Sequence, residues 1–239
     1  MKKMIIMDNS NFTLKSTKKI FTKPKSPQLL VFDIETVPLE EGNYSATQLN
    51  FIQKKLKSAQ LRNPNLDIAT ETSKICGTDP YLASIVCIGL FYPLNGQSIA
   101  LTNVSEKAIL ESFWDQLKKY SGIFISFNGV RFDVPFILKR SLHHGVKPSN
   151  MTFLQHTKYN TYPPHYDVML QMGRENIYSL KEACDFFGVP SSKEGEVKAE
   201  SVAQAYKEGR INEIAEYCLR DLNSTYLLYD KLRSYTTNS

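Results

Sequence analysis

Four acidic residues on three separate segments carry the clearest chemical signal in this chain. Asp33 and Glu35 lie in the apolar run LLVFDIETV, Asp133 lies in SFNGVRFDVPF, and Asp221 lies in EYCLRDL. Burying a carboxylate is costly unless it is paired with a cation or binds a metal. Each of these acids nevertheless lies in or beside a strongly apolar stretch. If they converge in the fold, they form a site for two divalent cations.

The first pair of acids lies on a predicted strand. Residues 28–36 form a short apolar run of the kind found in buried strands. Alternate residues of a strand point to the same face, so Asp33 and Glu35 share one face and their apolar neighbours share the other. A D-x-E pair also occurs on the solvent face of many strands, but this run is too apolar for an ordinary edge strand. We therefore expect both carboxylates to bind metal.

Asp133 opens a predicted helix over residues 133–144, with Pro135 in its first turn and Gly145 just past its end. Aspartate is a preferred N-cap residue, which would explain Asp133 without any metal. A helix N-terminus is also a fixed place to mount a metal-binding carboxylate. Both interpretations remain open at this position.

Tyr217 and Asp221 lie four residues apart on the last predicted helix, residues 211–233, and therefore share a face. A core tyrosine and a surface aspartate would have the same spacing. The helix also carries leucines that can pack it over the sheet: Leu219, Leu222, Leu227 and Leu228. We expect this packing to bring Tyr217 and Asp221 to the carboxylates of the strand.

The remaining elements predict an α/β fold with a mixed central sheet flanked by helices. An insertion over about 40–80 starts with a helix and continues as a loop rich in Asn, Pro, Asp and Thr. Ser179 and Glu182 form a capping box for a helix that ends at Gly188. Further strands are expected over 82–91, 97–101 and 122–127, further helices over 45–60, 105–120 and 197–207, and a loop over 157–166.

The net charge of +5 is concentrated at the start of the chain. Residues 1–30 hold seven lysines against one acid, Asp8, so the remainder sums to about −1 (+5 minus +6). We expect residues 1–26 to be a flexible basic tail and residues 27–239 to be one domain. The tail either adds sequence-independent affinity for phosphates or only solubilises the chain, and the second interpretation is the simpler one.

The composition argues against several classes of protein. No apolar run approaches the length of about 18 residues that a membrane span needs, and the start of the chain lacks the apolar core of a signal peptide. The four cysteines show neither C-x-x-C pairing nor zinc-ligand spacing with histidines. We therefore expect a cytoplasmic protein with reduced cysteines and no membrane association.

The three motifs together resemble the DnaQ-like superfamily of 3′–5′ exonucleases. The matching elements are D-I-E-T closing the first strand, N-x-x-x-F-D opening a later helix, and Y-x-x-x-D on the C-terminal helix, over about residues 28–232. The chain looks like the branch with four acids and a tyrosine (DEDDy type), which includes the proofreading domains of family B DNA polymerases. The resemblance implies a ribonuclease H-like fold. It also implies that the metal ligands are Asp33, Glu35, Asp133 and Asp221, and that Tyr217 orients the attacking water.

The same resemblance implies a reaction. With two Mg²⁺ or Mn²⁺ ions, the enzyme would hydrolyse phosphodiester bonds from the 3′ end of single-stranded or frayed DNA, in proofreading or repair. Asn128 and Phe132 would contact the terminal nucleotide, although loop packing explains them equally well. We expect a stand-alone exonuclease, and the motifs do not identify its protein partners. The alternatives are an exoribonuclease acting on short RNA and a catalytically silent nucleic-acid-binding module of the same fold.

Four other polar residues have simpler interpretations. Lys181, Lys193 and Lys198 are expected to be solvated surface residues instead of phosphate ligands. Asp167, in the run HYDV over 165–168, is either a further acid near the site or a structural residue at a strand end, and we expect the structural role.

Overall fold

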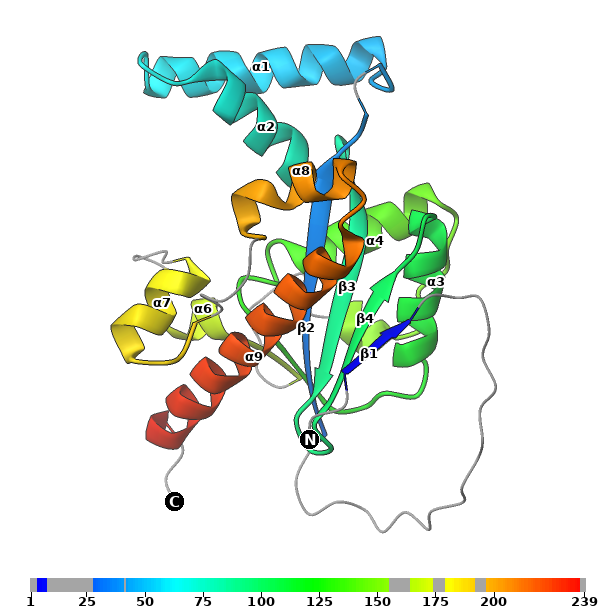
Figure 1. The fold of residues 1–239 in the computed structure, drawn as a ribbon, viewed down its shortest axis with the longest axis vertical. Coiled ribbons are helices and arrows are strands. Elements are labelled where there is room, and N and C mark those ends of the chain that lie inside the picture. Colours follow the sequence, from blue (N-terminus) through cyan, green and yellow to red (C-terminus); the bar gives the residue numbers. More distant parts are fainter. Residues whose placement is uncertain are drawn as a thin grey trace.

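A mixed six-stranded sheet lies at the centre of the computed structural model, which describes residues 4–7, 28–40, 42–154, 164–173, 179–191 and 197–236 (Figure 1). Its strands are β1 (Met4–Met7), β2 (Leu29–Pro38), β3 (Ala83–Tyr92), β4 (Gln97–Thr102), β5 (Ile123–Ser126) and β6 (His165–Asp167). Their order in space is β1-β4-β3-β2-β5-β6. Strand β3 runs antiparallel to β2 and to β4, and the other neighbours are parallel. The strand that carries Asp33 and Glu35 is therefore central.

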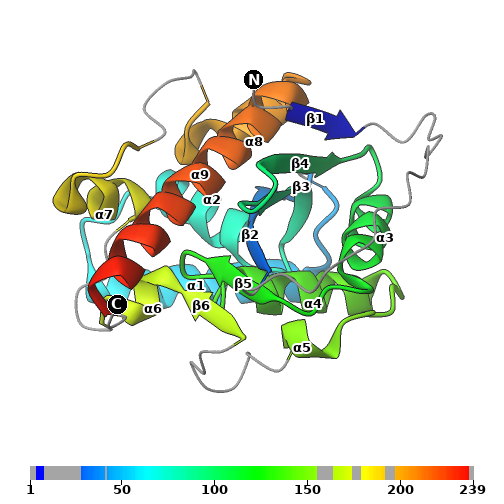
Figure 2. The same ribbon diagram turned by 90° about the horizontal axis from the view of Figure 1, so that it is seen from below.

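Helices cover both faces of this sheet (Figure 2). One face is packed by α3 (Glu106–Leu117), α4 (Asp133–His143) and α5 (Met151–Leu154). The other is packed by α6 (Val168–Gln171), α7 (Leu180–Phe187), α8 (Val202–Lys207) and the long α9 (Ile211–Thr236). A short 3₁₀ helix, Ala199–Ser201, precedes α8. The predicted α/β architecture is confirmed. Within the described residues, no helix has both the length and the apolar character of a membrane span.

Local sequence signals explain where several helices begin and end. Ser179 and Glu182 form the predicted capping box of α7, which ends at Gly188 with a φ of 62°. A left-handed residue of this kind ends many helices because glycine adopts positive φ without steric cost. Helix α1 (Ala46–Arg62) has a second capping box between Ser45 and Gln48. These helix limits therefore follow from short-range hydrogen bonds.

Two predictions of irregular structure were wrong in part. Residues 1–26 were expected to be a flexible tail, yet Met4–Met7 form β1 and pair in parallel with β4. An apolar run of four residues between lysines and Asp8 is too short to predict a strand. The predicted loop 157–166 includes the start of β6, because His165 and Tyr166 pair with β5. Residues 8–27 and 155–163 lie outside the described part of the chain.

The insertion contains a second helix where a loop was expected. Helix α2 (Ile68–Thr78) begins at Asp67, whose side chain accepts a hydrogen bond from the Thr70 backbone N–H at 2.7 Å. It packs through Cys76 against Leu82 and α1. Helices α1 and α2 together form an arm, residues 44–78, with α1 lying farther from the sheet than α2 (Figure 1). At its base the Thr36 hydroxyl donates to the Gly77 carbonyl at 2.6 Å.

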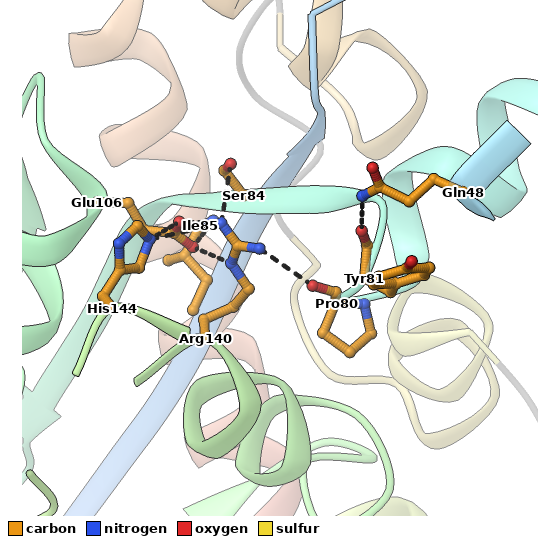
Figure 3. A network of polar contacts seen from close by, with 8 residues as sticks. All are labelled: Gln48, Pro80, Tyr81, Ser84, Ile85, Glu106, Arg140 and His144. Atoms are coloured by element: carbon orange, nitrogen blue, oxygen red, sulfur yellow. Dashed lines mark hydrogen bonds and ion pairs between the residues drawn. The ribbon is translucent and has the colours of Figure 1, made fainter. Parts of the chain in front are cut away.

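A buried ion pair joins α3, α4 and the start of β3 (Figure 3). Arg140 on α4 donates to both carboxylate oxygens of Glu106 at the start of α3 and to the Pro80 carbonyl at 3.2 Å. Glu106 also accepts from the Ile85 backbone N–H at 2.7 Å. His144 contacts the same carboxylate at 2.6 Å. Burial opposes ionisation of Glu106, but the hydrogen bonds from Arg140, Ile85 and His144 outweigh it and lower its pKa.

Candidate active site

The acids of β2 lie on the sheet face that α9 covers. In the register between β2 and β3, Asp33 is opposite Gly89 and Glu35 is opposite Cys87. Phe32 and Ile34 point the other way, into the core beneath α3 and α4. The predicted alternation along the strand is confirmed. Glu35 is only 8% exposed although it carries a carboxylate.

Helix α9 brings three side chains to these acids. The Cys218 sulfur lies 3.8 Å from the Asp33 carbonyl oxygen and 4.0 Å from its Oδ2. One ligand-type atom from each of Asp33, Glu35 and Cys218 lies within 4.8 Å of the others. Tyr217 hydrogen-bonds Asp221 one turn further along, and both interact electrostatically with Asp33 and Glu35. The structure thus places the Tyr217–Asp221 face of α9 against the strand acids.

Gly89 allows α9 to approach the sheet this closely. A Cβ atom at this position would lie 2.6 Å from the Cys218 sulfur and 2.9 Å from Leu222 Cδ1. Both neighbours are fully buried, so neither can move aside easily. The absence of a side chain at Gly89 therefore sets the distance between α9 and the acids of β2.

We expect Gly89→Ala to separate α9 from the sheet and to disturb the site. Overpacking of this kind costs about 1–3 kcal/mol, which lowers the melting temperature of a domain of this size by about 2–12 °C. The affinity of the acids for Mn²⁺ should fall further than the loss of stability explains. Gly77→Ala is the matched control, because its Cβ would come no closer than 3.9 Å to Pro38. Equal melting temperatures for Gly89→Ala and Gly77→Ala would contradict this role of Gly89.

Asp133 reaches the same cluster from α4. It is the first residue of that helix and is 2% exposed. Its Oδ1 accepts a hydrogen bond from the Ile34 backbone N–H at 3.0 Å, and its carboxyl group also hydrogen-bonds that of Asp33. The N-cap interpretation is wrong, because Phe132 occupies the N-cap position and Asp133 is the first residue inside the helix. The helix start instead points the carboxylate at β2.

Burial and mutual repulsion dominate the electrostatics of the cluster. Burial, followed by the charges of Asp133 and Asp221, raises the pKa of Asp33 well above its usual range. Burial and then the charge of Asp33 do the same for Glu35. Burial also raises the pKa of Asp133 to about 7. Among the described residues, the charged groups with the largest effects on Asp33 and Glu35 are acids and a thiol, and none of these groups is a cation. A divalent metal ion fits this set of oxygen donors.

The two predicted substrate contacts lie on the loop before α4. Asn128 has a φ of 63°, uncommon for a residue other than glycine, and its backbone N–H donates to Asp167 at 2.9 Å. Its Oδ1 is buried and has no hydrogen-bond partner within the described part of the chain. The Phe132 ring packs against Phe136 with centroids 5.4 Å apart. Asp167 has the expected structural role, since it also accepts from Val130 and caps α6. Substrate contact by Asn128 and Phe132 remains a prediction.

A cavity of about 560 Å³ opens beside the α9 end of the site. Tyr217 and Asp221 line it together with Ser179 at the start of α7. Lys181 and Lys198 are exposed, as expected, and they line the same cavity as Asp221. Lys193 lies outside the described residues.

Sequence reasoning missed two cysteines of the site. Cys87 and Cys218 are fully buried, and a hydrogen bond between the two thiols is the largest of the effects that raise the pKa of Cys218. All four cysteines are free, as expected for reduced thiols. The only sequence signal for Cys218 was its position next to Tyr217. That signal points to the site only when the packing of α9 on β3 is known.

The similarity of the fold to a solved structure indicates the class of protein. The family B DNA polymerase of the hyperthermophilic archaeon Pyrobaculum calidifontis has a similar fold, with a TM-score of 0.58 and 17% sequence identity. The match covers 90% of this chain and 25% of that polymerase. The chain therefore has the ribonuclease H-like fold of a family B polymerase exonuclease domain, as predicted.

A family model then identifies the family. Residues 83–238 match the family described as a predicted 3′–5′ exonuclease related to the exonuclease domain of PolB, and the chain belongs to that family. The matched range includes Asp133, Tyr217 and Asp221 and starts after β2. The catalytic subunit of DNA polymerase epsilon from Dictyostelium discoideum is 30% identical over 123 residues, or 50% of this chain and 5% of that protein. The chain thus matches only a small part of either polymerase.

Proposed function

We propose that this chain is a metal-dependent 3′–5′ exonuclease that removes nucleotides from single-stranded or frayed DNA. The observation that carries the proposal is the convergence of Asp33, Glu35 and Asp133 with Tyr217 and Asp221 of α9; the largest charge effects on Asp33 and Glu35 come from other acids and a thiol. The family supports the direction of cleavage. Both relatives named above are DNA polymerases, which supports DNA as the substrate.

The four carboxylates would hold two divalent cations. Oxygen ligands favour Mg²⁺ or Mn²⁺ over softer metals. Asp33, which interacts with all the other acids, would hold the ions together with Glu35, Asp133 and Asp221. When bound, such ions stabilise the negative charge that develops on the attacking and leaving oxygens of the phosphodiester.

Tyr217 would orient the attacking water without removing its proton. Burial, and then the charges of Asp221 and Glu35, raise the pKa of Tyr217 far above neutral pH. The phenol therefore remains protonated and acts as a hydrogen-bonding group, not as a general base. Lys181 and Lys198 in the adjoining cavity would attract the phosphates of the strand end. Asn128 and Phe132 would contact its last nucleotide.

Tyr217→Phe should slow cleavage without weakening metal binding. Loss of one orienting hydrogen bond in a buried site should lower kcat by about 10²-fold, and the dissociation constant for Mn²⁺ should stay within about twofold. Calorimetric titration and single-turnover digestion measure the two effects separately. Tyr206→Phe, at a more exposed tyrosine on α8, is the matched control. An unchanged rate would remove Tyr217 from the mechanism.

A paired digestion tests the substrate. Matched single-stranded DNA and RNA oligonucleotides, each labelled at the 5′ end, are incubated with Mn²⁺ and the wild-type protein. Faster shortening of DNA from its 3′ end supports the proposal, and faster shortening of RNA would instead support the exoribonuclease. Binding of both without shortening of either would support a silent module.

A further inference from the structure

The outer helix of the arm carries an unbalanced positive charge. Helix α1 holds Lys54, Lys55, Lys57 and Arg62 and has no acidic residue. All four side chains are exposed. Within the described part of the chain, none of them forms an ion pair, so their charge is available to a partner. The concentration is local, because the chain outside residues 1–30 is close to neutral.

One face of α1 is buried against α2 and another is exposed. Ile52 and Ala59 are buried, and Ile52 packs with Cys76 of α2 and Leu82. The adjoining face forms a shallow hollow lined by Phe51, Lys54, Lys55, Ser58, Leu61 and Arg62. These residues recur every three or four positions, so they form one continuous stripe. The half-buried Phe51 ring also packs against Tyr81, with ring centroids 5.8 Å apart. Leu61 is 79% exposed, and the Lys55 ammonium lies 5.2 Å from the Phe51 ring centroid. An aromatic ring among cations is the combination that binds nucleic-acid strands.

The arm is anchored next to the acids of β2. Thr36, the residue after Glu35, bonds the Gly77 carbonyl at the end of α2. Gln48 of α1 donates to the Tyr81 carbonyl at 2.6 Å, and Arg140 donates to the adjacent Pro80 carbonyl (Figure 3). The eleven residues of α2 span about 16 Å at 1.5 Å per residue. That length corresponds to about five nucleotides of a stacked strand at about 3.4 Å each.

We propose that the outer face of α1 binds the phosphate backbone of the nucleic-acid strand whose 3′ end enters the active site, about five nucleotides from that end. The inference rests on the proposed function and adds a second contact region to it. Charge complementarity identifies the occupant: Lys54, Lys55 and Arg62 line the hollow with the Phe51 ring, and an aromatic ring among exposed cations fits a polyanion with stacking bases. Lys57 adds a fourth exposed cation on the same helix. The contact positions long substrates and leaves the chemistry unchanged.

A charge variant of the arm tests the proposal. In one protein, Lys54, Lys55, Lys57 and Arg62 are all replaced by glutamine; these exposed positions tolerate the change. The control protein replaces Lys118, Lys119, Lys139 and Lys147 by glutamine, four lysines that flank or lie on α3 and α4 away from the arm. Fluorescence anisotropy in EDTA measures binding of single-stranded DNA of about 20 and about 4 nucleotides, and digestion with Mn²⁺ measures kcat and KM.

The arm variant should lose affinity for the long DNA alone. If three phosphate contacts disappear, the slope of log K against log salt falls by about 2. The wild type would then lose about 16-fold more affinity than the variant between about 50 and 200 mM salt. The affinity for the short DNA and the value of kcat should be unchanged. The control protein should have the same affinities and salt slope as the wild type. An unchanged salt slope, or an equal loss on short DNA, would overturn the proposal. Binding without cleavage by the wild type would instead defeat the proposed function.

Discussion

Asp33→Asn is expected to lower the exonuclease rate on the order of 10⁴-fold, equivalent to about 5.5 kcal/mol of transition-state stabilisation. Asp33 interacts with Glu35, Asp133 and Asp221, so its carboxylate is the one that both metal ions would share. Asparagine has nearly the same shape but cannot supply the charge. Single-turnover digestion of labelled DNA at saturating Mn²⁺ measures the loss.

The same substitution should raise the melting temperature of the metal-free protein. The pKa of Asp33 in the folded chain lies above its unfolded value, so the folded state binds more protons and loses stability as the pH rises through the folded pKa. Removing this carboxylate therefore stabilises the fold more at about pH 7.5 than at about pH 5. Thermal unfolding in EDTA at both pH values measures the difference.

Asp115→Asn serves as the control for both measurements, since Asp115 is exposed on α3. It should change neither the rate nor the melting temperature. An Asp33→Asn protein that unfolds at a lower temperature and remains active would mean that Asp33 stabilises the fold and does not bind the catalytic metal.

Arg140→Met is expected to destabilise the protein by about 3–5 kcal/mol, because it leaves the Glu106 carboxylate buried without its partner. The side chains of Arg140 and Glu106 are only 6% and 8% exposed. The melting temperature should fall by about 6–20 °C. Since α4 begins at Asp133 and carries Arg140 two turns later, activity should fall in the protein that remains folded.

A double variant separates the buried charge from general loss of packing. In Glu106→Gln with Arg140→Met, the neutral amide still accepts from the Ile85 backbone N–H and no charge is left unpaired. This protein should be more stable than Arg140→Met alone. If the double variant is instead less stable than Arg140→Met, and the stability losses of the two single substitutions add, the ion pair does not hold α4 in place.

The parts of the fold that could be predicted depend on short-range patterns. Alternation in residues 28–36 placed Asp33 and Glu35 on one face of a buried strand, and the structure has this arrangement. The capping box at Ser179 and the glycine at 188 defined α7 in the same way. In each case the determining contacts lie within a few residues, so the sequence contains the whole signal.

Helix α2 shows where local patterns are insufficient. Its sequence, IATETSKICGT, is rich in residues with low helix propensity and was predicted as a loop. The helix forms because Asp67 caps it and Cys76 packs against Leu82 and α1. Tertiary packing thus overrides propensity, and that packing is absent from a local window of sequence.

The parts of the site that could not be predicted are contacts between residues far apart in the sequence. Gly89 and Cys218 meet across 129 residues of chain, and Arg140 meets Glu106 across 34. No periodicity or motif joins such positions, and each residue alone has an ordinary interpretation. Asp133 was ambiguous for the same reason: only the position of Ile34 shows that its carboxylate points to β2 instead of capping α4.

The most direct measurement is a timed digestion of a 5′-labelled single-stranded DNA with Mn²⁺ supplied or removed by EDTA. With Mn²⁺, the wild-type protein should produce a ladder that shortens one nucleotide at a time from the 3′ end, and Asp33→Asn or EDTA should abolish it. DNA that stays full length with the metal present, or shortening that continues in EDTA, would contradict a metal-dependent exonuclease site at these acids.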